Sequence, residues 1–326
     1  MATFPITLYG FRESRPGPRW RALFDAIWPA YRRFYLSEGR AARPPVADAG
    51  QALATYMPEL LPAWARLAEQ TGFDDLATAF LTGWDLPRFA PAACSQVTIT
   101  SPGPALLRNY DYRPALFEQV TCSTDHLQPV IGTSDCLWGL LDGMNDSGLA
   151  ISLAFGGDRT AGVGFAIPMV VRYLLETCAT VVEAQQALTR LPIAMVYNLT
   201  MIDISGAALT AYVGPGREPE FRPQPAATNH RWDTPLDPAH ARRFGSVERL
   251  ERIRRLAEAT APSDEVAASM ITAPMRVDDY SGGFGTLYTA DYRLDEKTLT
   301  YRWPGRSWTR TFDAPDDTVD VLLVDG

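Results

Sequence analysis

The stretch "CSQVTITSPGPALLRNYDY", residues 94–112, decides the fold of this chain. Two β-like runs flank a Pro-Gly-Pro turn, which is the pattern of a β-hairpin. The residues before it, 1–93, instead place apolar side chains at helical spacing. The change of period at Cys94 predicts a strand-rich domain over 94–326, preceded by a helical segment over 1–93.

The helical expectation for 1–93 rests on a clear apolar stripe. Its members recur at intervals of three and four residues and are Trp20, Leu23, Phe24, Ile27, Tyr31 and Phe34. Two further helical runs follow, at 51–72 and 74–84. The proline-rich stretch 85–93 is expected to be an extended connector to Cys94.

Strand and helix patterns alternate in blocks after the hairpin. Two strands flank a turn at 145–148, two helices follow over 164–191, and a second hairpin turns at Ser205–Gly206. Ser246 is the N-cap candidate of an amphipathic helix, and strands close the chain over 285–305. This order predicts an α+β protein with layered sheets.

Composition excludes several classes of function. The 326 residues carry a formal net charge of −8, which argues against nucleic acid as a partner. The four cysteines and three histidines lack zinc-ligand spacing, and we expect neither metal nor cofactor. The apolar segment 162–178 contains Pro168 and Arg172, so we expect no membrane span. The start of the chain lacks a signal-peptide pattern, which predicts a cytoplasmic protein with free thiols.

Cys94 is the candidate nucleophile. A free thiol has a pKa of about 8.5 and needs a base to activate it. If the bond between Ala93 and Cys94 were cut, the new α-amine of Cys94, with a pKa of about 7.7–8.0, could take the proton of its own thiol. The thiol could make this cut itself by attacking the Ala93 carbonyl. Residues 1–93 would then be a prosegment that hides the amine until cleavage.

Arg108 and Asp111 are candidate partners of Cys94 on the return strand. A guanidinium near the sulfur favours the thiolate and could bind an acyl carbonyl, and a carboxylate near the amine would orient it. Residues three apart on a strand point to opposite faces. We therefore expect a bulge or bend that lets both side chains reach the thiol.

These features resemble the N-terminal-nucleophile (Ntn) amide hydrolases of the choloylglycine hydrolase and penicillin acylase type, and most closely the isopenicillin N acyltransferase branch. The resemblance rests on five motifs in order: Cys94, "RNYDY" at 108–112, "DGMNDSGLAISLAF" at 142–155, "ATNH" at 227–230 and "SVER" at 246–249. It implies an αββα sandwich of two antiparallel sheets between helical layers.

The resemblance also implies roles for individual residues. Cys94 would be the nucleophile, its amine the base, and Arg108 and Asp111 the family's catalytic Arg and Asp. Asn229 would donate its amide to the oxyanion, and Arg249 would brace the network. A backbone N–H of Ala154 or Phe155 would be the second oxyanion donor. The bile-salt enzymes have Asn at this place and "SLAFGG" does not, which argues against bile-salt-like substrates.

The sequence predicts an amidase or acyltransferase that acts on a small acyl amide through a thioester on Cys94, with acyl-CoA as a further candidate acyl donor. The aromatic residues Tyr110, Tyr112, Trp138 and Phe155 favour an apolar acyl group. Two rivals stay open: an uncut cysteine hydrolase with His126 or His230 as base, and an inactive binding protein of the same fold. The sequence leaves open the acceptor, the oligomeric state and whether the prosegment stays bound.

Overall fold

The predicted hairpin is formed by strands β2 (Ala93–Ile99) and β3 (Ala105–Tyr112), which pair antiparallel with Cys94 opposite Tyr110. The computed structural model describes residues 2–90, 92–232, 238–259 and 261–326. Every residue of both strands is buried, as expected for strands that are covered on both faces.

A seven-stranded antiparallel sheet extends from this hairpin. Its order is β11–β2–β3–β13–β14–β15, and β12 pairs with β13. The additional strands are β11 (Ala226–Ala227), β12 (Asp278–Asp279), β13 (Phe284–Arg293), β14 (Thr298–Trp303) and β15 (Arg306–Thr311). The closing strands predicted over 285–305 are β13 and β14.

The second sheet has nine strands in the order β10–β9–β8–β7–β6–β5–β4–β1–β16. They are β10 (Glu220–Arg222), β9 (Ala208–Val213), β8 (Tyr197–Asp203), β7 (Leu149–Phe155), β6 (Gly139–Asn145), β5 (Pro129–Asp135), β4 (Val120–Asp125), β1 (Thr3–Arg12) and β16 (Asp317–Val324). The strands from β2 to β15 pair antiparallel with one another, as expected, and the one parallel strand pair among the described residues joins β4 to β1 of the N-terminal segment.

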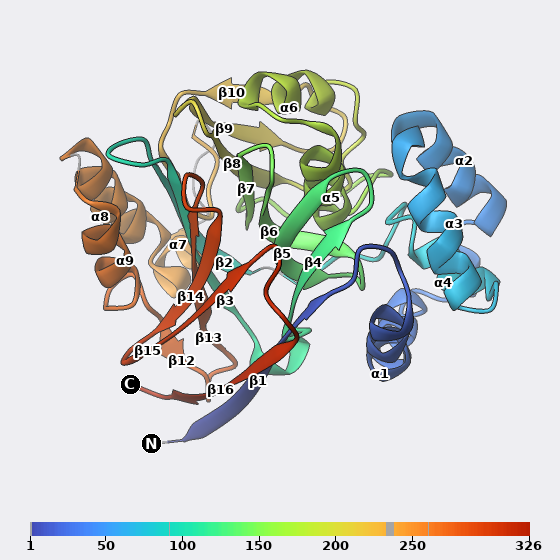
Figure 1. Cartoon of the computed structure of the whole chain (residues 1–326), viewed down its shortest axis with the longest axis horizontal. Coiled ribbons are helices and arrows are strands. Elements are labelled where there is room, and N and C mark those ends of the chain that lie inside the picture. Colours follow the sequence, from blue (N-terminus) through green and yellow to red (C-terminus); the bar gives the residue numbers. More distant parts are fainter. Residues whose placement is uncertain (1, 91, 233–237, 260) are drawn as a thin grey trace.

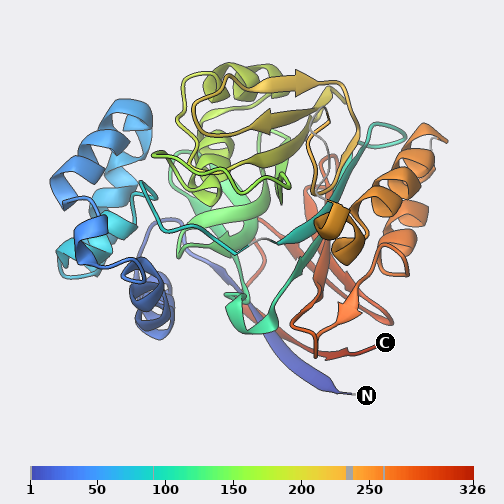
Figure 2. The same cartoon turned by 180° about the vertical axis from the view of Figure 1, so that it is seen from behind.

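Helices cover the outer face of each sheet. Helices α5 (Ile167–Thr177) and α6 (Val181–Leu188) pack on the nine-stranded sheet, and α8 (Ser246–Glu258) and α9 (Ser263–Met270) pack on β2 and β3. The short helix α7 (Pro238–Phe244) contacts α8. Strands β2 and β3 contact β7 across the interior, so the order of layers is helix, sheet, sheet, helix (Figures 1 and 2). The predicted α+β class is confirmed.

The first 93 residues are not helical throughout. Helices α1 (Pro18–Tyr35), α2 (Val46–Tyr56), α3 (Leu61–Gln70) and α4 (Asp75–Phe80) lie together at one side of the sandwich (Figure 1). Residues 3–12 instead form β1, where buried Ile6 and Leu8 alternate with exposed Pro5 and Thr7. This period of two is that of a strand with one buried face, and sequence reasoning missed it.

One helix boundary also differs from its prediction. The helix expected near Ser246 is α8, but its cap position is Gly245, with a left-handed φ of 56°. Ser246 is the first helical residue, and its hydroxyl has no hydrogen-bond partner among the described residues. A glycine fits this cap because it has no Cβ to oppose a positive φ.

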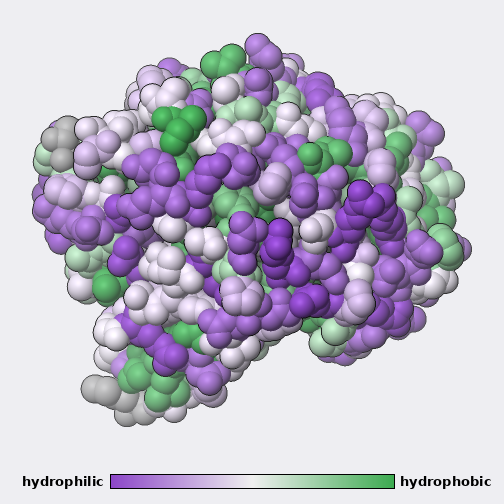
Figure 3. Space-filling view, viewed as in Figure 1, coloured by the Kyte–Doolittle hydropathy of each residue, from purple (hydrophilic) through white to green (hydrophobic). Residues whose placement is uncertain are grey.

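Hydrophilic side chains cover most of the face shown in Figure 3, and hydrophobic residues form small separate groups on it. Within the described part of the chain, no helix combines the length and the apolar character that crossing a bilayer requires.

Candidate active site

Cys94 and Arg108 share the face of the hairpin that is turned toward the nine-stranded sheet. Arg108 Nη2 donates a hydrogen bond to Cys94 Sγ at 3.3 Å, and Nη1 forms an ion pair with Asp142 of β6. The side chains of all three residues are fully buried. The guanidinium therefore lies directly against the sulfur, where a positive charge stabilises a thiolate.

Asp111 lies on the opposite face, toward α8. Its Oδ2 accepts a hydrogen bond from Arg249 Nη1 at 3.1 Å, and its Oδ1 accepts one from Thr286 Oγ1 at 2.7 Å. Arg249 Nη1 also donates to Ser95 Oγ at 2.6 Å. Arg249 is 1% exposed, so it belongs to the interior and not to the solvated charged side of its helix.

The bulge expected between Arg108 and Asp111 is absent from the β2–β3 pair, whose register is regular. The register shift lies instead in β13, between Thr286 and Tyr288, opposite Asp111 and Tyr110. Arg108 alone reaches the sulfur, while Asp111 acts from the other face through Arg249. The site therefore straddles the sheet.

Asn229 connects the two faces. Its Oδ1 accepts hydrogen bonds from the backbone nitrogen of Cys94 at 2.8 Å and from Arg249 Nη2 at 3.3 Å. Its Nδ2 donates to the backbone oxygens of Phe155 at 3.0 Å and Ala92 at 3.3 Å. Cys94, Arg108, Asp111, Asn229 and Arg249 thus form one connected cluster.

The loop that carries Asn229 is fixed from β8. Asn198 Nδ2 donates to the backbone oxygens of Thr228 and His230 at 2.8 and 3.0 Å. Gly157 has a φ of 81° and lies so close to this loop that a Cβ on it would be 2.5 Å from the backbone oxygen of Asn229. In the sequence, Asn198 stands out only as the first residue of the Asn-x-Thr triplet "NLT" at 198–200, a pattern typical of glycosylation sites, whereas in the structure its side chain supports the loop.

The predicted oxyanion donors and the cleavage junction lie beside this cluster. Ala154 and Phe155 are the last residues of β7, and Phe155 contacts Asn229 through its carbonyl oxygen. A backbone N–H of either residue as an oxyanion donor stays a prediction. Ala93 is buried in β2 opposite Asp111, and cleavage of its bond to Cys94 also stays a prediction.

Burial dominates the electrostatics of the cluster. It raises the pKa of the Cys94 thiol, and the adjacent Arg108 guanidinium partly opposes the rise. It also raises the pKa of Asp111, against the pull of Arg249, and lowers the pKa of Arg249. The thiol is therefore mainly protonated near neutral pH and needs a base before it can attack.

A carboxylate that sequence reasoning did not single out stands behind Arg108. Asp142 accepts hydrogen bonds from Tyr288 and Tyr292 of β13 and from Thr133 of β5, besides its ion pair with Arg108. Asp142 opens the quoted motif at 142–155. The two tyrosines lie 146 and 150 positions further along the chain, so no local pattern could have connected them with it.

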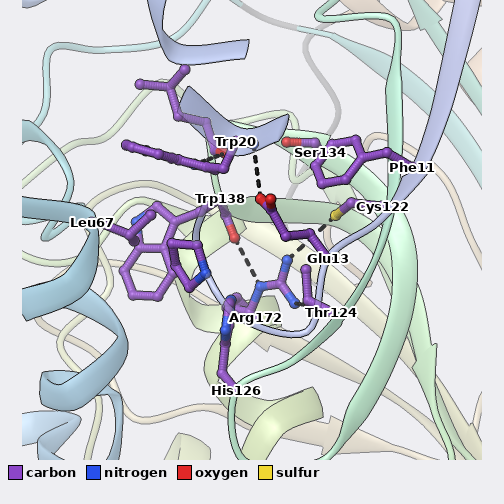
Figure 4. Close-up of a pocket in the computed structure, with 12 residues that line it drawn as sticks. Phe11, Glu13, Trp20, Leu67, Cys122, Thr124, His126, Ser134, Trp138 and Arg172 are labelled. Atoms are coloured by element: carbon purple, nitrogen blue, oxygen red, sulfur yellow. Dashed lines mark hydrogen bonds between the residues drawn. The ribbon is translucent and has the colours of Figure 1, made fainter. Parts of the chain in front are cut away.

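A second thiol–guanidinium pair lies elsewhere, under the N-terminal segment (Figure 4). Arg172 Nη2 lies 3.7 Å from Cys122 Sγ, and Arg172 also bonds to Thr124 and Glu176. Burial raises the pKa of Cys122. Cys136 and Cys178 are buried as well. These three thiols lie outside the Cys94 cluster.

The two rival bases are not bonded to the nucleophile. His126 lines the pocket of Figure 4 together with Trp138, whose ring was expected near the site strands, and burial lowers the pKa of His126 to about 3. His230 Nδ1 lies 3.2 Å from Thr228 Oγ1. Among the described residues, neither histidine forms a hydrogen bond with Cys94 Sγ. In the same part of the chain, no group of three or more His, Cys, Asp and Glu side chains could hold a metal ion.

Two facing sheets with helices on both outer faces, and a buried cluster of cysteine, arginine, aspartate and asparagine that straddles the seven-stranded sheet, define the class of Ntn amide hydrolases and acyltransferases. The sequence model of the family described as "Acyl-coenzyme A:6-aminopenicillanic acid acyl-transferase" matches residues 99–308, which is more than half of the chain. The chain belongs to this family, as the resemblance predicted, and it is an amide-hydrolysing or acyl-transferring enzyme. The match includes Arg108, Asp111, Asn229 and Arg249 and begins five residues after Cys94.

Solved structures resemble this one at low sequence identity. An arginine-to-leucine variant of conjugated bile acid hydrolase from Clostridium perfringens shows the same fold and is 12% identical, with 72% of this chain and 98% of that chain covered and a TM-score of 0.51. Penicillin V acylase from Agrobacterium tumefaciens is 15% identical (67% and 84% covered, TM-score 0.45). A Caenorhabditis elegans N-acylethanolamine-hydrolyzing acid amidase ortholog is 16% identical, with 62% of this chain and 92% of that chain covered and a TM-score of 0.45. A comparison with curated proteins gave no match.

Proposed function

We propose that the chain cuts itself between Ala93 and Cys94, and that the mature enzyme cleaves or transfers the acyl group of a linear amide through a thioester on Cys94. One observation carries the proposal: the nitrogen and the sulfur of Cys94 are held by different partners. Asn229 Oδ1 holds the nitrogen at 2.8 Å and Arg108 holds the sulfur at 3.3 Å. A residue that serves as both base and nucleophile needs this arrangement.

Self-cleavage would begin with attack of the Cys94 sulfur on the Ala93 carbonyl carbon. The C–S bond forms, the C–N bond breaks, and the departing nitrogen takes the thiol proton and becomes the α-amine. Water then hydrolyses the thioester and releases the carboxylate of Ala93. The freed amine remains within reach of Asn229 Oδ1, and Asp111 supports this position because it fixes Arg249, which also bonds to Asn229.

Turnover would repeat this chemistry on an external amide. The α-amine takes the thiol proton, the sulfur attacks the acyl carbon, and the proton passes to the departing amine. Water or an amine then takes the acyl group and restores the thiol. Asn229 Nδ2 and a backbone N–H of Ala154 or Phe155 would hold the oxyanion. The bond from Asn229 Nδ2 to the Ala92 oxygen would be lost once the cut end moves away, which frees a donor on the side chain that holds the Cys94 nitrogen.

We infer that the acyl group of the substrate is apolar and that either water or an amine accepts it from Cys94. Tyr110 is the strand partner of Cys94, and Phe155 is joined to Asn229. The family name supports acyl-coenzyme A as a donor and an amine as an acceptor. Four buried free thiols support the cytoplasm as the location.

A chain extension tests the base. Residues 1–93 are co-expressed with a second chain that starts at Cys94, because β1 belongs to the nine-stranded sheet and a chain without it would lack a strand. In a matched pair, the second chain starts with Gly-Cys94, which moves the amine about 3.8 Å along the chain. We expect the glycine to abolish turnover. Full activity of both assemblies would eliminate the amine as base and favour a histidine.

A further inference from the structure

Asp142 is the ion-pair partner of Arg108, on the Nη1 side of the guanidinium that does not contact Cys94. It projects from β6 of the nine-stranded sheet, whereas Arg108 projects from β3 of the seven-stranded sheet. Their ion pair crosses the interior, and both side chains are 0% exposed. The Arg108 guanidinium is therefore held at both terminal nitrogens, by the ion pair at Nη1 and by the hydrogen bond to the thiol at Nη2.

Four donors hold Asp142 in turn. Its Oδ2 accepts from Arg108 and from Tyr288 Oη, the latter at 2.6 Å. Its Oδ1 accepts from Thr133 Oγ1 at 2.7 Å and Tyr292 Oη at 2.5 Å. Burial raises the pKa of both phenols well above the usual value, so they remain donors. The Asp142 carboxylate thus accepts from four donors, and Arg108 is the one cation among them.

Resting on the proposed function of Cys94 as nucleophile, we propose that Asp142 is a positioning residue: it orients Arg108 and balances its charge, and thereby keeps the thiol in the protonated form from which the N-terminal amine takes its proton. An unbalanced guanidinium against the sulfur would stabilise a resting thiolate. A thiolate formed in that way is a weaker nucleophile, because nucleophilicity falls with thiol pKa. It also carries no proton to pass to the departing amine.

The other charged groups that act on the thiol are Arg108 and Asp111 from β3, and Arg249 from α8. The phenols of Tyr110 and Tyr197, whose pKa values burial raises, also interact with it, and Asp135 acts on Arg108. Arg249 is already paired with Asp111 on the far face of the sheet. Arg108 is the one cation among these that contacts the sulfur, so its partner Asp142 governs the local balance of charge.

The test is a pH titration of the ultraviolet absorbance of the Cys94 thiolate in the full chain, taken as the difference from Cys94→Ala in the same background; its midpoint is the pH at which half of the Cys94 thiol is ionised. In Asp142→Asn we expect the midpoint to move down by about one pH unit or more, because Arg108 loses its counter-charge. In Tyr292→Phe we expect it to move up by about half a unit, because Asp142 loses a donor and its charge acts more strongly on Arg108. Tyr35→Phe is the control, since this buried hydroxyl has no hydrogen-bond partner in the described structure.

A role in folding alone would lower the amount of folded protein and leave the midpoint unchanged. Unchanged midpoints in folded Asp142→Asn and Tyr292→Phe would overturn the proposal. If Asp142→Asn does not fold, Tyr292→Phe decides alone, and the absence of an upward shift overturns it. The readout needs neither cleavage nor turnover, so failure of the proposed function would appear separately, as an uncut chain whose thiol titration still responds to Asp142.

Discussion

At the scale of single residues, Asn229 has two functions that can be separated. Its side-chain oxygen holds the Cys94 nitrogen, and its side-chain amide is the candidate oxyanion donor. Asn229→Asp keeps an acceptor and loses the donor, whereas Asn229→Ala loses both. The pair therefore distinguishes positioning of the amine from stabilisation of the transition state.

We expect turnover by the cut enzyme to fall about 10²–10³-fold in Asn229→Asp, which is the usual cost of one lost oxyanion donor. Asn229→Ala should fall further, because the amine also loses its acceptor. Initial rates on an acyl amide, measured on variants with unchanged circular dichroism, give the answer. Near-normal turnover of Asn229→Asp would remove the amide from the oxyanion hole.

The Arg249–Asp111 pair is fully buried, so removal of one partner leaves an uncompensated charge. We expect Arg249→Met to lower the free energy of unfolding by about 3–5 kcal/mol. The double variant with Asp111→Asn should recover most of this loss. The exposed pair Arg255–Glu251 is the control, and Arg255→Met should change stability by about 1 kcal/mol or less. Denaturant unfolding that gives equal losses for Arg249→Met and Arg255→Met would contradict the assignment.

At the scale of elements, β1 ties the N-terminal segment to the catalytic domain. It pairs with β16 over eight residues and with β4 over four, so its removal would expose two strand edges. Helix α1 adds Tyr31, whose hydroxyl bonds to Glu118 and Asp135. We therefore expect the fragment 1–93 to stay bound after cleavage.

Size-exclusion chromatography of the cut protein tests this expectation. Both fragments should elute together in native buffer and separate only in denaturant. Substitution of Leu8 by Asp, on the buried face of β1, should promote their separation, whereas Pro5→Asp, on the exposed face opposite exposed Leu322, should not. Elution of free 1–93 from the unmodified protein under native conditions would contradict the role given to β1.

His126, in the turn between β4 and β5, should make the free energy of unfolding depend on pH. Burial lowers the pKa of His126 to about 3, below its unfolded value of about 6.5. A histidine with a lowered pKa favours the folded state above pH 6.5, and this contribution is lost as the pH falls toward 3. Between about pH 7 and pH 5 the loss should reach at most about 2 kcal/mol.

Urea unfolding at these two pH values checks the effect. The unmodified chain should lose more stability on acidification than His126→Leu, whose side chain does not titrate. His126 Nδ1 has no partner in the described residues, so the substitution removes no hydrogen bond from that atom. Equal losses in both proteins would show that His126 does not titrate in this range.

At the scale of the whole molecule, the sequence predicts what depends on neighbours along the chain. Alternating residues predict the hairpin 94–112, and helical spacing predicts α1 and α8. The strand β1 carries a local alternation of buried and exposed residues that sequence reasoning overlooked, but its pairing with β16 and β4, more than about 100 residues away, could not be predicted. Asp142 was missed because its tyrosine partners are also far along the chain and belong to the other sheet. The motifs named all five clustered residues, but only the structure shows that Arg108 and Asp111 act from opposite faces.

Intact-mass spectrometry of the purified full-length protein tests directly whether the chain cuts itself between Ala93 and Cys94. We expect two fragments, 1–93 and 94–326, the second beginning at Cys94, and a single uncut chain for Cys94→Ala. Cleavage of Cys94→Ala at the same bond would show that another agent makes the cut. A folded, active, unmodified protein that remains a single chain would contradict the N-terminal-nucleophile mechanism itself.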